Sequence, residues 1–288
     1  MCVCSQPSRL VMSMILVYGD DSADEQRQRV SALAIAVGKK DAWDEFEPRW
    51  KARNDGIPFH AKDCETDNGD YARFPHEHNK ALYKDLTVMI AESDLIGRAI
   101  AIDLKAQREA FPDGPDVAYF KAFAELLEAV KDVCAHFQLP AKFAFDIGPE
   151  NEYNAGLLYQ GTRECSPKML EWFDPEISFL SAKNSAKLQV ADLLAYEAMK
   201  NVDNELSATG HKRRSWQALA RTNRFSVIAY SIEWFEDVKR NMPRLEELSG
   251  FNRSDYIQWL KDRNRQHSIS NLIHFTNWIA IRDQKQGN

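Results

Sequence analysis

The hydrophobic and polar positions along the chain predict strands that alternate with helices. Short continuous apolar runs, typical of buried strands, occupy residues 11–18, 30–37, 95–104 and 142–147, and a further strand is predicted over 177–182. Apolar residues at helical spacing predict helices from residue 41 onward and over 79–93, 116–137, 153–164 and 187–200. A polar turn between the first two strands indicates a hairpin. This order predicts an α/β fold with a mixed central sheet flanked by helices.

The segments between these elements lead to three local predictions. Asp41 is a candidate N-cap for the first helix. Residues 59–63 follow Pro58 and indicate a short strand or its exit. Residues 64–78 are polar and predict a loop.

The chain changes character after residue 200. Residues 201–211 are polar and contain Gly210, which is typical of a linker or an exposed loop. Residues 225–230 predict one more strand, and the remainder has a helical pattern. We therefore expect one domain over residues 12–200 and a C-terminal, mainly helical extension over residues 201–288.

Charge is divided unevenly between these two parts. Residues 1–200 carry 23 Lys+Arg against 33 Asp+Glu, whereas residues 201–288 carry 14 against 10. The most basic segment has no acidic residue and holds Lys212, Arg213, Arg214, Arg221 and Arg224. Such a patch is able to follow nucleic-acid phosphates, with Trp216 stacking on a base. A solvated helix with Trp216 in the core would have the same pattern, so both interpretations stay open.

Cysteine usage and hydropathy indicate a cytoplasmic protein with no membrane partner. The five cysteines match no zinc-binding spacing, and their odd number does not suit a disulfide framework: Cys2, Cys4, Cys64, Cys134 and Cys165. We interpret them as reduced thiols. No stretch is long and apolar enough to span a membrane, and the N-terminal residues lack the layout of a signal peptide.

Carboxylates end or interrupt three apolar segments. Asp20 follows the first apolar run, Asp146 ends a later strand, and Asp192 lies on an otherwise apolar helix. A bare carboxylate in apolar surroundings costs several kcal/mol unless it is protonated, paired with a base or bound to a cation. Since no basic partner is close in sequence, the three carboxylates favour a cation. Turn formation and a satisfied hydrogen-bond network are the structural alternatives.

Three motifs resemble those of the bacterial "domain of unknown function 3800" family. The segment at residues 20–23 (Asp-Asp-Ser-Ala) resembles its Asp-Glu-Ser-Gly signature, and residues 59–63 (Phe-His-Ala-Lys-Asp) resemble its Phe-His-x-x-Asp element. Residues 188–193 (Leu-Gln-Val-Ala-Asp-Leu) are similar to its Ile-Gln-Leu-Ala-Asp-Leu helix, which is the most specific of the three. The resemblance covers roughly residues 14–200.

This resemblance implies a ribonuclease H-like fold with carboxylates gathered around divalent metal. It implies Asp20, Asp146 and Asp192 as metal ligands and catalytic residues, with His60 and Asp63 as accessories. We expect two Mg²⁺ or Mn²⁺ ions and metal-dependent hydrolysis of nucleic-acid phosphodiesters, in DNA or RNA. A mobile-element or phage-defence setting fits such a nuclease. Gln189 is expected to orient the Asp192 carboxylate without itself binding the metal.

The chain departs from the family signature at two positions. Asp21 replaces the usual Glu, and Ala23 stands where the signature has Gly, which would cost about 1 kcal/mol if that position needed a positive φ. These departures favour the alternative of a non-catalytic module that binds nucleic acid or a protein partner. A phosphatase with an aspartyl nucleophile is disfavoured because residues 20–22 lack a spaced Asp-x-Asp.

Overall fold

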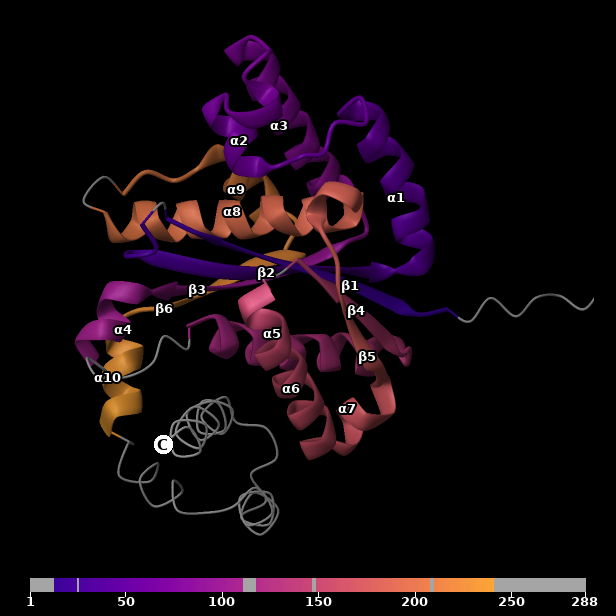
Figure 1. The fold of residues 1–288 in the computed structure, drawn as a ribbon, viewed down its shortest axis with the longest axis vertical. Helices are drawn as coiled ribbons and strands as arrows, with labels where there is room; N and C mark the ends of the chain where they lie inside the picture. Colours follow the sequence, from indigo (N-terminus) through magenta and orange to yellow (C-terminus); the bar gives the residue numbers. More distant parts are fainter. Residues whose placement is uncertain (1–12, 25, 111–117, 147–148, 208–209, 241–288) are drawn as a thin grey trace, which may run out of the picture.

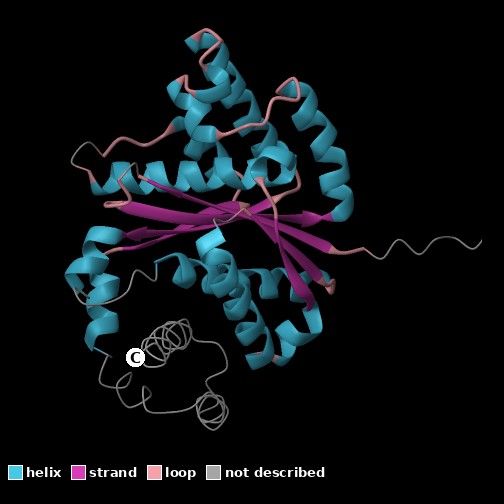
Figure 2. Ribbon diagram, viewed as in Figure 1, coloured by secondary structure: helices cyan, strands magenta, loops and turns pink. Residues whose placement is uncertain are grey.

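In the computed structural model, residues 13–24, 26–110, 118–146, 149–207 and 210–240 are described. They form a mixed α/β fold, in which a six-stranded sheet is flanked by helices on both faces (Figures 1 and 2), so the predicted fold class is confirmed. The strands are β1 (Ile15–Ala23), β2 (Val30–Lys39), β3 (Ile96–Asp103), β4 (Ala141–Phe145), β5 (Phe173–Phe179) and β6 (Phe225–Tyr230).

The helices divide between the two faces of the sheet (Figure 1). On one face lie α1 (Lys40–Arg53), α2 (Ala61–Thr66), α3 (His76–Glu92), α8 (Ala186–Leu206) and α9 (Arg214–Ala220). On the other lie α4 (Leu104–Ala110), α5 (Ala118–Phe137), α6 (Pro149–Cys165), α7 (Pro167–Trp172) and α10 (Ile232–Arg240). Two short 3₁₀ turns, η1 (Gly69–Tyr71) and η2 (Ala182–Asn184), complete the described elements.

The strand order in the sheet is β5-β4-β1-β2-β3-β6. Strand β2 pairs antiparallel with both β1 and β3, while the other neighbours pair in parallel. Because β1 and β4 run side by side in the same direction, their carboxyl ends meet at one edge of the sheet. This register places the residues that follow Gly19 and Phe145 next to each other.

The two faces of the sheet carry side chains of different size, which fixes how closely a helix approaches. The face toward α8 presents alanines in its centre: Ala32, Ala34, Ala36, Ala99 and Ala101. The face toward α5 presents larger aliphatic residues: Leu33, Ile35, Val37, Ile100 and Ile102. This difference follows from the period of two along a strand, which sends alternate residues to opposite faces. The small residues leave room for α8 to lie close against β1 and β2.

Helix α8 is buried on nearly all sides between the sheet and the helices α1, α2 and α9 (Figure 1). It begins after Ser185, whose side chain accepts a hydrogen bond from the Leu188 N–H at 3.4 Å. Its sequence is apolar on most sides, as expected for a helix inside the core. The few polar side chains that it carries are therefore held in protein surroundings rather than in solvent.

The prediction for residues 59–78 was wrong in its local structure. Residues 61–66 form helix α2 instead of a strand, and the predicted polar loop contains η1 and the first turn of α3. A few buried side chains anchor this region, with Phe59, Cys64 and Tyr71 packed in the core on the α8 face. The predicted N-cap is also displaced, because α1 begins at Lys40 and Asp41 lies in its first turn.

The expected boundary at residue 200 falls inside a helix. Helix α8 continues to Leu206, where a linker was predicted, and the predicted strand at 225–230 is confirmed as β6. Strand β6 pairs in parallel with β3 and extends the same sheet. Residues 241–288 of the expected extension lie outside the described residues.

Candidate functional site

Asp20 lies within strand β1 and faces α8. The strand was predicted to end near Tyr18, but it continues to Ala23, and Asp20 pairs with Ala34 of β2. Leu16 and Tyr18 pack on the α8 face, so the period of two directs Asp20 to the same side. Its side chain is almost completely buried, with 8% of the residue exposed. Its Oδ1 accepts a hydrogen bond from the Asp21 N–H at 2.8 Å.

Asp146 is placed beside Asp20 by the pairing of β1 with β4. It follows the last residue of β4, and its backbone N–H donates to the Gly19 carbonyl at 2.9 Å. A Cβ on Gly19 would lie 2.1 Å from the Phe145 ring, so this close approach requires glycine. The Asp146 Oδ2 accepts from the Ala182 N–H at 3.0 Å, which fixes the half-buried carboxylate.

Asp192 reaches the same region from the middle of α8. Its residue is 6% exposed, and its Oδ2 accepts a hydrogen bond of 2.6 Å from the Ala61 N–H at the start of α2. His60 lies next to it, with Nε2 at 3.9 Å from Asp192 Oδ1 and Nδ1 at 3.0 Å from Asp63 Oδ2. The segments at residues 59–63 and 188–193 therefore contact each other.

The three carboxylates act on one another electrostatically. Burial raises the pKa of Asp20 well above its ordinary value, and the negative charges of Asp192, Asp146 and Asp21 raise it further. Burial also raises the pKa of Asp192, to about 6, although His60 and the Ala61 N–H act in the opposite direction. Within the described ranges, no Lys or Arg forms an ion pair with Asp20, Asp146 or Asp192. The site thus brings together three carboxyl groups, two of them almost completely buried, whose charged forms disfavour one another.

The chemistry of this donor set fits a hard divalent cation such as Mg²⁺ or Mn²⁺, which prefers carboxylate oxygens. Across the part of the chain that the structure describes, no three His, Cys, Asp or Glu side chains already form a metal-coordinating group. Like charges repel, so bringing three carboxylates closer together requires a countercharge.

Gln189 has a different role from the one predicted. Its Oε1 accepts from the Trp50 indole N–H at 3.0 Å, and its Nε2 donates to the Ala182 carbonyl at 3.0 Å. Ala182 in turn donates its N–H to Asp146. Gln189 therefore supports the turn that holds Asp146, rather than Asp192 on its own helix.

The departures from the family signature carry little strain. Ala23 is the last residue of β1, pairs with Ser31 and does not have a positive φ. Asp21 follows Asp20 in the strand, so its side chain points to the α5 face. Its Oδ2 lies 3.9 Å from Arg27 Nη2. Neither substitution alters the face of the strand that carries Asp20.

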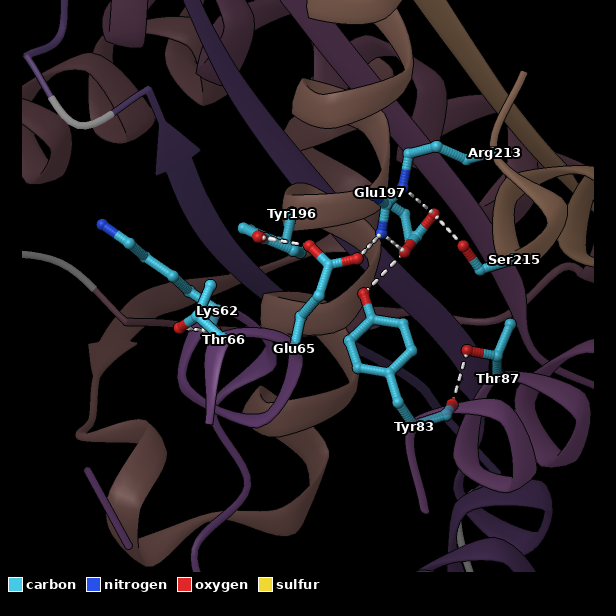
Figure 3. Close-up of polar contacts among 9 residues, drawn as sticks. All are labelled: Lys62, Glu65, Thr66, Tyr83, Thr87, Tyr196, Glu197, Arg213 and Ser215. Carbon is cyan, nitrogen blue, oxygen red and sulfur yellow. Dashed lines mark hydrogen bonds and ion pairs between the residues drawn. The ribbon is translucent and has the colours of Figure 1, made fainter. Parts of the chain in front are cut away.

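Arg213 is part of a buried polar network and not of a phosphate-binding surface (Figure 3). Its Nη2 lies 2.6 Å from both Glu65 Oε1 and Glu197 Oε1, and its Nε donates to Glu197 Oε2 at 3.0 Å. Glu197 is 0% exposed and also accepts from the hydroxyls of Tyr83 and Ser215, each at 2.6 Å. The assignment of Arg213 to nucleic-acid binding is therefore corrected, because its guanidinium is occupied by two carboxylates.

Within the described residues, three other basic side chains of the predicted patch are free of such a network, whereas Arg224 pairs with Asp94 at 3.1 Å between Nη1 and Oδ1 and donates to the Ser93 carbonyl. Lys212, Arg214 and Arg221 are exposed. Trp216 is partly buried and packs against the core on the α8 face, which favours the structural interpretation of this side chain. The sequence pattern alone did not separate Arg213 from its neighbours, because its partners lie on α2 and α8.

Other predictions are met in part. Cys64 and Cys134 are buried free thiols, and Cys2 and Cys4 lie outside the described residues. Among the helices described, none is long and apolar enough to cross a membrane. Asp103, a further strand-end carboxylate, caps the next helix by accepting from the Ala106 N–H at 2.9 Å.

Comparisons with protein-family models, with curated proteins and with solved structures gave no match.

Proposed function

We propose that the protein is a metal-dependent nuclease whose site is formed by Asp20, Asp146 and Asp192. The observation that carries this proposal is the convergence of three carboxylates from β1, the end of β4 and α8, without a Lys or Arg ion-pair partner in the described ranges. Buried charges of one sign are costly, and a divalent cation is the partner that carboxylate oxygens suit best.

The resemblance to the "domain of unknown function 3800" family supports the same conclusion by another route. Its motifs are distant in the sequence, yet residues 59–63 and 188–193 contact each other directly. The mixed sheet with an opening hairpin, the strand-end carboxylates and the carboxylate on a late helix are the features that a ligand site of this family would need.

Each residue of the site has a distinct task in this proposal. Asp20, Asp146 and Asp192 would hold Mg²⁺ or Mn²⁺; when bound, such ions acidify a water molecule and neutralise charge on a phosphodiester. His60 is half exposed and its Nδ1 is paired with Asp63, so its Nε2, which lies 3.9 Å from Asp192 Oδ1, is placed to receive or give a proton. Lys212, Arg214 and Arg221 would contact the nucleic-acid backbone.

A non-catalytic module that binds nucleic acid or a protein partner is the competing function. The departures at positions 21 and 23 are its main support. The departure at position 23 carries little weight, because the backbone at Ala23 has no positive φ and needs no glycine. We therefore rank it second, and the experiment below distinguishes the two.

Calorimetric titration with Mn²⁺, followed by cleavage assays, tests the proposal. Wild-type protein should bind Mn²⁺ and cleave labelled DNA or RNA, and Asp192→Asn should lose both activities while staying folded. Asp103→Asn is the matched control, since Asp103 also ends a strand but serves as a helix cap. Nucleic-acid binding in EDTA without cleavage in any metal would favour the non-catalytic module, and equal Mn²⁺ binding by wild type and Asp192→Asn would refute the site.

A further inference from the structure

Helix α2 is tied to α8 by two hydrogen bonds that are one helical turn apart on both helices. At the first residue of α2, the Ala61 N–H donates to Asp192 Oδ2 at 2.6 Å. Four residues later, Glu65 Oε2 accepts from the Tyr196 hydroxyl, also at 2.6 Å. Because Asp192 and Tyr196 are four residues apart as well, they are neighbours on one face of α8, and α2 is held against that face at two points.

Glu65 is the residue through which α2 joins the buried polar network (Figure 3). Its Oε1 lies 2.6 Å from Arg213 Nη2, and the same guanidinium is paired with Glu197 of α8. Burial acts to raise the pKa of Glu65, but the charge of Arg213 and the Tyr196 hydroxyl outweigh it and hold this pKa below its ordinary value. The Glu65 carboxylate is therefore charged at neutral pH, and the hydrogen bonds that it accepts are of the strong, charge-assisted kind.

The position of α2 depends on contacts of this kind because the helix is short. It has six residues, which is far too few for a helix to be stable by itself in water. Cys64 packs into the core, but an apolar contact has no preferred direction. The hydrogen bonds at Ala61 and Glu65 require defined distances and angles, so they set where α2 lies along α8.

The start of α2 is the part that faces the carboxylate site. His60 immediately precedes the helix, and its Nε2 lies 3.9 Å from Asp192 Oδ1. Asp63 lies in the first turn and pairs with His60 Nδ1 at 3.0 Å. A displacement of α2 would therefore move His60 and the Ala61 N–H together, away from the carboxylate that they contact.

We infer that Tyr196 and Glu65 are positioning residues of the carboxylate site. Their hydrogen bond keeps α2 in the place where the Ala61 N–H orients Asp192 and where His60 faces it, so both residues act through α2 and not on the metal or the substrate. This inference rests on the proposed function, because it concerns metal binding at Asp192. Hydrogen-bond partners that orient a metal ligand commonly affect metal affinity as strongly as a change near the metal itself.

The substitution Tyr196→Phe tests this role. It keeps the aromatic ring in the core, leaves Glu65 paired with Arg213 and changes no charge, so an effect on Mn²⁺ affinity would not come from long-range electrostatics. Calorimetric titration with Mn²⁺ is carried out where urea denaturation shows the variant to be fully folded. The affinity should then be about 10-fold weaker than in wild type, at the lower end of the range for outer partners of metal ligands.

Tyr83→Phe is the matched control. Tyr83 is also buried, and its hydroxyl donates at 2.6 Å to Glu197 of the same network, but this bond joins α3 to α8 and does not involve α2. Each substitution removes one hydrogen bond to a carboxylate, so both should lower the urea midpoint by a similar amount. The Mn²⁺ affinity of folded Tyr83→Phe should stay within about twofold of wild type.

A double-mutant cycle with Ala61→Pro tests whether the effect passes through α2. Ala61 is the first residue of the helix, where proline is well tolerated, and His60 before it is extended, with φ −136° and ψ 117°, as suits a residue that precedes proline. Ala61→Pro removes the N–H that Asp192 accepts and should weaken Mn²⁺ binding by about 10- to 100-fold. In that background, Tyr196→Phe should add less than about a twofold effect, because the two substitutions disrupt the same contact.

The outcomes distinguish failure of this inference from failure of the proposed function. Equal Mn²⁺ binding by wild type and Tyr196→Phe would overturn the positioning role and leave the metal site standing. An equal loss of affinity in Tyr196→Phe and Tyr83→Phe, or additive effects with Ala61→Pro, would also overturn it, since either would show that α2 does not transmit the effect. The two tyrosine variants decide the question by themselves if Ala61→Pro does not fold. Wild type that binds no Mn²⁺ would overturn the proposed function itself.

Discussion

Replacing Asp192 by asparagine should raise the stability of the protein without Mn²⁺ and abolish the stabilisation that Mn²⁺ gives to the wild type. Burial raises the pKa of Asp192 from 3.8 to about 6. The folded state therefore binds this proton more tightly than the unfolded state does. As the pH rises from 3.8 through about 6, the carboxyl ionises first in the unfolded state, so the free energy of unfolding falls.

The magnitude follows from the same two values. A tenfold change in proton affinity corresponds to about 1.4 kcal/mol, so the ionised side chain costs about 3 kcal/mol above pH 6. Asparagine has nearly the same shape, carries no charge and keeps an oxygen that accepts the Ala61 N–H. In EDTA at about pH 8, Asp192→Asn should raise the free energy of unfolding by roughly 1–3 kcal/mol, and near pH 3 by almost nothing.

Urea denaturation with and without Mn²⁺ measures both effects. A cation that binds only the folded wild type at 100 times its Kd adds about 2.7 kcal/mol to the free energy of unfolding, and the variant should lack this gain. Asp103→Asn should behave as wild type in both conditions. A variant that is less stable than wild type in EDTA at high pH would refute the reasoning, since it would show that the charge of Asp192 is compensated in the folded protein.

Three further predictions concern residues around the site. Gly19→Ala should lower the free energy of unfolding by about 1–3 kcal/mol, because a Cβ would lie 2.1 Å from the Phe145 ring. Gly156→Ala is its control: Gly156 lies in open space on α6, so alanine there should raise the free energy of unfolding by about 0.5–1 kcal/mol. Urea denaturation measures both changes. Arg213→Met should lower the free energy of unfolding by about 3–5 kcal/mol, because it leaves the buried Glu197 without its cationic partner. The exposed Arg214→Met should stay within about 0.5 kcal/mol of wild type. Equal effects of the two substitutions would contradict the network in Figure 3. Gln189→Leu should lower the free energy of unfolding by about 1–3 kcal/mol and weaken Mn²⁺ binding less than Asp192→Asn does. Unchanged Mn²⁺ affinity in calorimetry would show that Gln189 does not position Asp146 for the metal.

Several elements follow from the sequence because their signals are local. The run at residues 30–37 predicts β2 and the run at 225–230 predicts β6, since neighbouring residues alone determine an apolar strand pattern. The helix predicted over 187–200 is α8, which ends six residues later than predicted. Polar residues near a helix end weaken the periodic signal, and the core position of Val202 is visible only in the fold.

Other residues depend on partners far away in the chain. Residues 64–78 predict a loop because they have few apolar side chains, yet Cys64 and Tyr71 are buried in the core on the α8 face and anchor the segment. Arg213 has the sequence pattern of a phosphate contact, but Glu65 and Glu197 occupy it. No signal close to Glu65 in the sequence indicates that the Tyr196 hydroxyl would donate to it.

The sequence by itself determined the class of the fold and the candidate carboxylates, because hydrophobic periodicity and a charge inside an apolar run are properties of adjacent residues. The tertiary structure decided the strand order, the electrostatic coupling of Asp20 with Asp146 and Asp192, and the contact of Ala61 with Asp192, which are 131 residues apart. Such contacts arise from the packing of α8 on a sheet face lined by alanines, a fit that depends on the whole core and that no single segment encodes.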